Sequence, residues 1–66
     1  MKEQYLIERS HQNLDDAYLM GHPFNDLESA IQEADFLHSI RAPKVVYAVL
    51  KVKDRIIDVN PVYWVG

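Results

Sequence analysis

Apolar residues recur at helical spacing in the middle of the chain. Asn25, followed three positions later by Glu28, matches a capping box, in which each side chain satisfies a free backbone donor at the helix start. Pro43 forces the helix to end at or before Ala42. The pattern predicts a helix over residues 26–41. Its apolar positions are Leu27, Ala30, Ile31, Ala34 and Leu37.

Alternating and β-branched runs on both sides of this helix predict strands. The first run covers residues 3–9, with Leu6 and Glu8 on one side of the strand and Tyr5, Ile7 and Arg9 on the other. Residues 44–53 are rich in valine and predict a second strand. The chain then turns at Asp54-Arg55, and a third strand returns over residues 56–59 as an antiparallel partner. Residues 62–65 resume as a short strand or fold over an edge.

The segment between the first strand and the helix, residues 10–24, has the composition of a loop. It contains histidine, asparagine, aspartate, Gly21 and Pro23, and its apolar residues indicate that it packs down. Together the elements predict an α+β fold, a single small domain over residues 1–66 in βαββ order with one helix packed on an antiparallel sheet. We expect the hairpin at 44–59 to be central and the first strand to lie at one edge.

Both faces of the predicted sheet are apolar. Alternation puts Val46 and Leu50 on one side of the second strand and Val45 and Tyr47 on the other. One helix covers only one face, so the loop before the helix, the C-terminal tail or another chain must cover the second. The residues that we expect to form the main core are Leu27, Ile31, Leu37, Val46, Leu50 and Ile57.

Several large apolar residues lie away from this expected core. At 100° per residue, Phe36 and Ile40 fall on the back of the helix. Two interpretations stay open. These side chains pack under the long loop while Tyr47 and Trp64 build a small second core, or they form an interface, where aromatic residues are enriched. The predicted partner-binding residues are Phe36, Ile40, Tyr47, Tyr63 and Trp64.

Length and charge indicate which partners and which location to expect for the protein. A chain of 66 residues buries barely enough apolar surface to offset the entropy of folding, and with no cysteine it has no disulfide to help. We therefore expect a homo-oligomer. The net charge of −3 argues against a general phosphate-binding surface. No apolar run reaches the length of a membrane span, and residues 1–4 do not resemble a signal peptide, so we expect a cytoplasmic protein.

The sequence offers little reactive chemistry. Two of the candidate metal ligands lie three positions apart on the predicted helix, but the set contains no spacing typical of a metal site. We expect no metal, no cofactor and no catalytic residue, and the two glycines provide no phosphate-binding loop. The adjacent aspartates are interpreted as turn formers. The candidate ligands are His11, His22, His38, Asp15, Asp16 and Asp35.

Basic residues gather around the predicted hairpin. Beside Tyr47 they could form a stacking and charged surface for nucleic acid. The favoured interpretation is that lysines protect a strand edge from pairing with other chains, which argues against a nucleic-acid partner. The basic residues are Lys44, Lys51, Lys53 and Arg55.

Three runs of the sequence, at residues 5–7, 27–31 and 45–52, resemble in order and composition the small strand-helix-strand-strand accessory proteins of bacteriophages and prophages. Some of these are anti-CRISPR or other anti-defence inhibitors. The resemblance implies a non-enzymatic, stoichiometric inhibitor that acts on a host protein by contact in the host cytoplasm, commonly as a homo-oligomer. It shares no motif from which a site residue could be transferred. The alternatives are an oligomeric protein that sequesters a small nucleotide signal and a small nucleic-acid-binding accessory protein.

Overall fold

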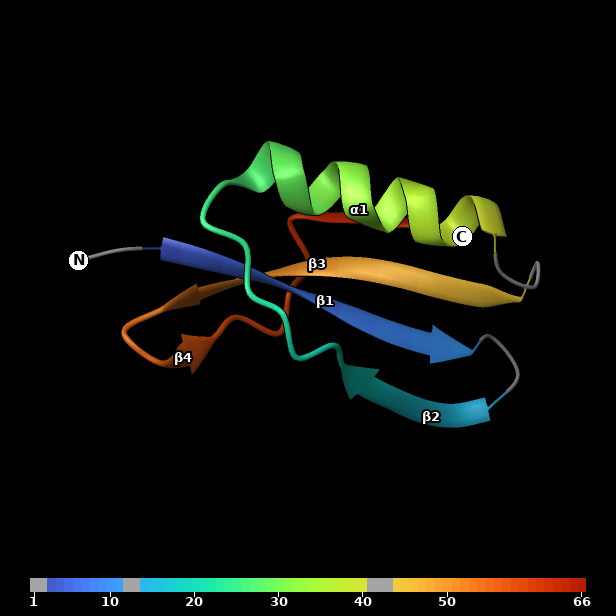
Figure 1. Ribbon diagram of the computed structural model, residues 1–66. Helices are drawn as coiled ribbons and strands as arrows, with labels where there is room; N and C mark the ends of the chain where they lie inside the picture. Colours follow the sequence, from blue (N-terminus) through green and yellow to red (C-terminus); the bar gives the residue numbers. More distant parts are fainter. Residues whose placement is uncertain (1–2, 12–13, 41–43) are drawn as a thin grey trace.

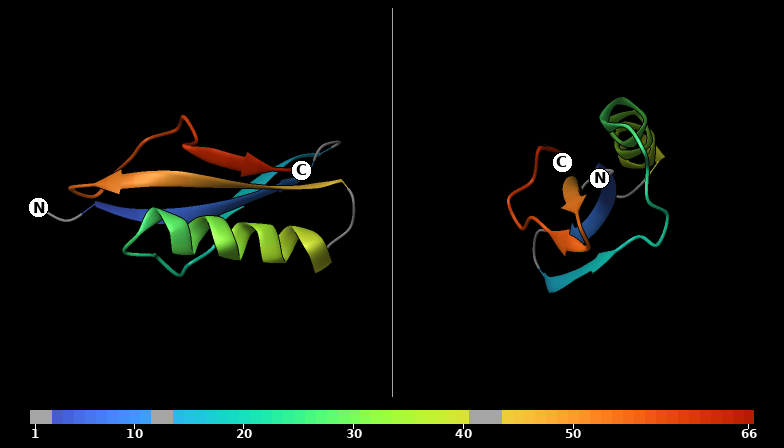
Figure 2. Two further views of the ribbon diagram at one scale, coloured as in Figure 1. Left: turned by 90° about the horizontal axis from the view of Figure 1, so that it is seen from above. Right: turned by 90° about the vertical axis from the view of Figure 1, so that its left-hand side faces the viewer.

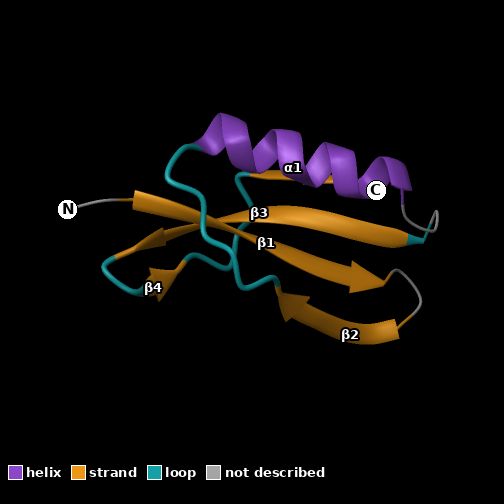
Figure 3. Ribbon diagram, in the orientation of Figure 1, coloured by secondary structure: helices purple, strands orange, loops and turns teal. Residues whose placement is uncertain are grey.

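In the computed structural model, one helix packs on an antiparallel sheet (Figure 1). This confirms the predicted α+β fold with a helix on an antiparallel sheet. The structure describes residues 3–11, 14–40 and 44–66, without the side chains of residues 14–16. Figure 3 separates the helix from the strands. The described elements are β1 (Glu3–His11), β2 (Leu14–Leu19), α1 (Leu27–Ile40), β3 (Val45–Lys53), β4 (Ile56–Ile57) and β5 (Tyr63–Val65).

The sheet has the strand order β2-β1-β3-β4, and β5 pairs with the same side of β3 as β4 does, nearer the start of β3. The prediction that the first strand lies at an edge is wrong, because β1 lies between β2 and β3. β2 comes from the segment that was predicted to be a loop. Its polar residues suit a short strand that pairs with β1 on one side and leaves the other side open to solvent.

Each long strand, β1 and β3, has an outer edge that is paired in two pieces. On β1, pairing with β2 is followed by two hydrogen bonds between Tyr5 and Phe24, of 2.9 and 2.8 Å, beyond a break that contains Pro23. On β3, pairing with β4 is followed by a break that contains Pro61, after which the Val62 nitrogen donates to the Val49 oxygen at 2.9 Å. Proline lacks the donor that continuous pairing needs, which explains why both edges are interrupted there.

The helix begins one residue later than the capping box predicts. Asp26, not Asn25, is the cap, because its carboxylate accepts hydrogen bonds from the Ser29 nitrogen at 3.0 Å and the Ser29 hydroxyl at 2.9 Å. The Asn25 side chain instead accepts a hydrogen bond from Gln4 at 3.2 Å. The predicted end of the helix at residue 41 and Pro43 lie outside the described residues.

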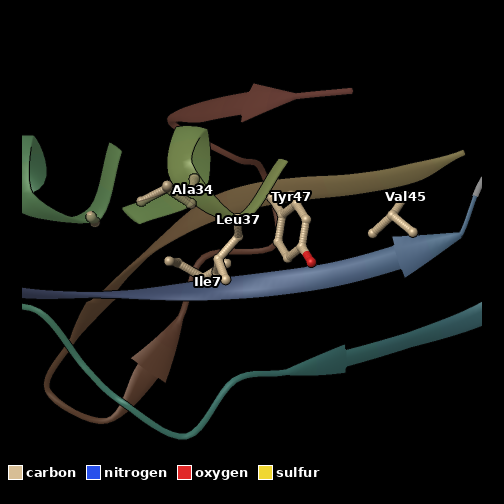
Figure 4. Close-up of a cluster of buried hydrophobic side chains, with 7 residues drawn as sticks. Ile7, Ala34, Leu37, Val45 and Tyr47 are labelled. Atoms are coloured by element: carbon tan, nitrogen blue, oxygen red, sulfur yellow. The ribbon is translucent and has the colours of Figure 1, made fainter. Parts of the chain in front are cut away.

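The main core lies between α1 and the face of β3 that carries Val45, Tyr47 and Val49 (Figure 4). The predicted facing of this strand is wrong, because the helix presents two small residues, Ala30 and Ala34, which leave room for the large Tyr47 ring. Leu37 is buried as expected, and Leu27 packs against the cluster from its rim. The core cluster comprises Ile7, Ala30, Ala34, Leu37, Val45, Tyr47 and Val49.

The turn between β3 and β4 is confirmed as a two-residue loop. Asp54 and Arg55 both adopt positive φ, 53° and 67°, between the paired residues Lys53 and Ile56. Two successive residues with positive φ define the type I′ turn, whose twist matches that of the strands it joins. Neither residue is glycine, so the turn carries conformational cost.

Candidate functional site

The sheet face opposite α1 is mostly apolar. Residues paired across neighbouring strands point to the same side, so the pairs Leu6↔Leu50, Ala48↔Trp64 and Val52↔Ile57 share one face. Leu19 joins them because it pairs with Glu8, which in turn pairs with Ala48. We name this surface the open face. Its described residues are Gln4, Leu6, Glu8, Ser10, Ala17, Leu19, Val46, Ala48, Leu50, Val52, Ile57 and Trp64.

No described element packs over the open face. α1 lies along β1 and β3 on the other side (Figure 2) and contacts β1, β3 and β5 from there. The two segments that the sequence offered as a cover, the one before the helix and the C-terminal tail, extend the sheet sideways as β2 and β5. Neither of these two segments therefore covers the open face. Of the three covers that the sequence offered, only another chain remains.

Exposure is greatest on the outer strands of the open face. Trp64 is 61% exposed and Leu19 41% exposed, whereas Ala48 and Leu50 on β3 are buried. Half-buried apolar side chains, among them Leu6 and Val46, lie between these extremes. The face is therefore a largely apolar area with a buried floor, an indole at one side and the polar residues Gln4, Glu8 and Ser10 along β1.

Glu8 lies in the middle of this apolar area. It is half-buried and belongs to a row of paired residues that runs across four strands: Leu19, Glu8, Ala48 and Trp64. It is the one charged residue among the described side chains of the open face. No hydrogen bond or ion pair within the described part of the chain involves its carboxylate.

The predicted partner-binding residues do not form one surface. Phe36 and Ile40 are each 57% exposed on the outer side of α1, as the helical spacing predicts, while Trp64 belongs to the open face on the other side of the sheet. Tyr47 is wrongly assigned to a surface, because it is fully buried in the core. The half-buried Tyr63 packs against the core and donates a hydrogen bond from its hydroxyl to Asp35.

Polar side chains on the helix side form local contacts. The Arg9 guanidinium donates to the Tyr18 hydroxyl, and its carbon lies 5.7 Å from the centre of that ring. Lys51 pairs with Glu3 at 3.0 Å, and this hydrogen-bonded carboxylate raises the pKa of the lysine. One of the four basic residues near the hairpin is therefore already engaged by an acid of the same chain.

The candidate metal ligands are dispersed. Asp35 accepts the Tyr63 hydrogen bond, and the His22 ring lies 5.1 Å from that of Phe24. The side chains of Asp15 and Asp16 lie outside the description. Among the side chains that are described, no group of three or more His, Cys, Asp or Glu residues could hold a metal ion.

Reasoning from sequence did not select Glu8, Leu19 or Leu6 for the site. The alternation in β1 placed Leu6 and Glu8 together, which the pairing confirms, so the signal for an apolar face with one acid was present. Leu19 gave no such signal because its segment was predicted to be a loop. Whether this face is covered or exposed depends on which side of β3 the helix packs against.

Comparisons with protein-family models, with curated proteins and with solved structures find no match to this chain. Among the residues that the structure describes, the one helix, α1, is too short and too polar to cross a bilayer.

Proposed function

We propose that this chain is a non-enzymatic protein-binding domain that acts by occupying a partner, and that the open face is the surface of contact. The observation that carries the proposal is that the segments available to cover this face pair at the sheet edges instead. A sheet face that is apolar over neighbouring strands gains stability when a further layer covers it. A contiguous exposed apolar area of this kind marks interaction sites in folded proteins.

The helix back, Phe36 and Ile40, is the weaker candidate for contact. Its two apolar side chains, four positions apart, form a small pair with polar residues such as Gln32 and Ser39 beside it along the helix, and exposed apolar residues in small numbers are common on protein surfaces. The open face joins apolar residues from five strands and includes Trp64, the one tryptophan of the chain. Tryptophan is strongly enriched among the residues that dominate binding energy.

The resemblance to phage and prophage accessory proteins adds the kind of partner and the mode of action. The partner would be a host defence protein, inhibited one-for-one by contact in the host cytoplasm. Inhibition by occupancy requires amounts of inhibitor comparable to its target. Titration of a target activity should therefore reach completion near equimolar amounts, and full inhibition at a hundredth of the target concentration would contradict this mode of action.

The contact surface is tested by site-specific photo-cross-linking in cells that carry the gene. A benzophenone amino acid replaces Trp64 in one variant and Phe36 in a second, which is a matched control because both rings are similarly exposed. We expect one discrete adduct from position 64, lost when Leu19→Lys is added, and no discrete adduct from position 36. Adducts from position 36 alone would move the function to the helix back.

Self-association is the second prediction about partners, and light scattering on a sizing column tests it. The sequence predicts a mass above that of the monomer. If an oligomer forms through the open face, Trp64→Lys should return it to the monomer while Phe36→Lys leaves it unchanged. A monomer at all accessible concentrations would contradict the predicted homo-oligomer and leave the open face for a different protein.

A further inference from the structure

The Glu8 carboxylate constrains what can cover the open face. It lies between Leu19 and Ala48 in the row that ends at Trp64 and makes no hydrogen bond or ion pair with another described residue. Any layer that covers the face removes water from this carboxylate. Burying a charged group without a partner is strongly unfavourable, whereas a well-placed opposite charge with hydrogen bonds offsets much of that penalty.

We propose that the open face binds an apolar segment of another protein that carries a lysine or arginine, whose cationic end pairs with Glu8 beside Trp64. The inference rests on the proposed function and adds the chemistry of the partner. Apolar side chains of the segment cover the half-buried Leu6, Val46 and Val52, and its one cation neutralises the one described charge of the face.

The spacing of the row suits a long cationic side chain. Glu8 and Trp64 are separated by two strand spacings, roughly 10 Å between backbones. Ala48, which lies between them, has only a methyl group and is buried, so it forms the floor of the row. The aliphatic stem of a lysine or arginine packs on such a surface while its charged end reaches a carboxylate. An indole nearby adds attraction for the cation.

Other occupants fit this charge less well. A second copy would present the same face, in which the described side chains include an acid and no cation, so a two-fold contact would bury two carboxylates. The phosphates of nucleic acid and of anionic lipid headgroups would be repelled by Glu8. A cationic, apolar protein segment is the occupant whose charge complements the face.

The experiment selects binders from a displayed library of random peptides about 16 residues long, enough for four helical turns. The immobilised baits are the wild type, Glu8→Gln, Glu8→Lys and Glu33→Gln. Glu33 is a matched control because it is a half-buried glutamate on the helix, away from the open face. Selected peptides are synthesised and their affinities are measured from the emission of Trp64, which reports on this face alone because the chain has no other tryptophan.

We expect the wild type and Glu33→Gln to select apolar peptides that contain lysine or arginine, and Glu8→Lys to select peptides with aspartate or glutamate. Replacing the peptide's cation by norleucine should weaken its binding to wild type about tenfold, which is 1.4 kcal/mol. This measurement needs no change in the protein, so it stands even where a variant folds poorly. Glu8→Gln should show the same loss with the unaltered peptide.

Two results would overturn the inference without touching the proposed function. Binding to immobilised Trp64→Lys is scored by retention of the displayed peptide, because this variant has no tryptophan. Peptides that lose this binding, but show no preference for lysine or arginine and tolerate norleucine, would mean that apolar contact alone selects the partner. A dimer in light scattering that Trp64→Lys dissociates would mean that a second copy occupies it. If instead no selected peptide depends on Trp64, the proposed contact surface fails as well.

Discussion

The Tyr63 hydroxyl donates a hydrogen bond to Oδ1 of Asp35 and so ties β5 to the helix. This bond raises the pKa of Tyr63, and partial desolvation and the negative charge of Asp35 act in the same direction. A raised pKa in the folded state stabilises the fold fully below the unfolded pKa, and the stabilisation is lost as pH rises through the folded value. We expect the free energy of unfolding to fall above about pH 10.

Denaturant unfolding of the wild type and Tyr63→Phe from about pH 7 to pH 11 checks this expectation. The variant should be less stable at neutral pH and should lose less stability in alkali. The raised pKa of Lys51 contributes an alkaline loss of the same sign through its contact with Glu3, so Lys51→Met serves as a control that keeps the Tyr63 contribution. Identical alkaline slopes for wild type and Tyr63→Phe would contradict the bond.

The buried hydroxyl of Tyr47 predicts an unusual substitution. It has no hydrogen-bond partner among the described residues, and an unpaired buried polar group costs about 1–3 kcal/mol. Tyr47→Phe keeps the ring and removes that cost, so thermal unfolding should show equal or higher stability. Tyr47→Ala, which leaves a cavity, should cost about 3–5 kcal/mol. A loss of more than about 1 kcal/mol in Tyr47→Phe would mean that the hydroxyl is paired in solution.

The start of the helix supplies a matched pair of variants. Asp26→Ala removes the acceptor of both Ser29 hydrogen bonds and should cost about 1 kcal/mol. Asn25→Ala removes the cap that the sequence favours, yet in the structure this side chain bonds only Gln4, so the cost should be a few tenths of a kcal/mol. Chemical denaturation distinguishes the two, and the reverse order would restore Asn25 as the cap.

The β3–β4 turn offers a stabilising change. Arg55 has a φ of 67°, a region where an L-residue with a side chain loses about 1–2 kcal/mol and glycine does not. Glycine removes this strain but has a greater entropy in the unfolded chain, which offsets part of the gain. Arg55→Gly should therefore stabilise the protein by about 0.5–1 kcal/mol. Lys53→Gly, which removes the same charge from a regular strand position, should destabilise it. A loss of stability in Arg55→Gly would contradict the turn type.

The helix was predictable because several independent signals agreed. Its apolar stripe, an acidic residue at its start and a proline beyond its end all point to the same segment, and within the described residues the cap differed by one residue. Asp26 and Asn25 are both good caps, so composition could not decide between them. The choice was made by Ser29, whose backbone and hydroxyl both reach Asp26.

The facing of β3 was not predictable from its own pattern, since valine or leucine recurs on both sides. The deciding information lies in another element. Ala30 and Ala34 leave space that Tyr47 fills, and a smaller Val46 or Ala48 would leave a void there. Large residues opposite a helix stripe of alanines were therefore the signal that the strand pattern alone lacked.

β2 was missed for a related reason. Its polar residues and the nearby Gly21 and Pro23 indicate a loop when the segment is considered alone. The strand exists because β1 has an unsatisfied edge, and an edge partner needs backbone groups more than apolar side chains. The pairing of β2 with β1 also leaves the open face exposed, because a segment that pairs beside β1 does not cover the sheet.

Titration calorimetry of the cross-linked partner, once purified, with the wild type, Trp64→Lys and Phe36→Lys tests whether the open face is the contact surface. We expect a stoichiometry of one and a loss of affinity of about 30-fold or more for Trp64→Lys, the scale of a dominant contact residue. Phe36→Lys, at a similarly exposed aromatic residue on the helix back, should bind within about threefold of wild type. Unchanged binding of Trp64→Lys together with loss in Phe36→Lys would contradict the open face as the working surface.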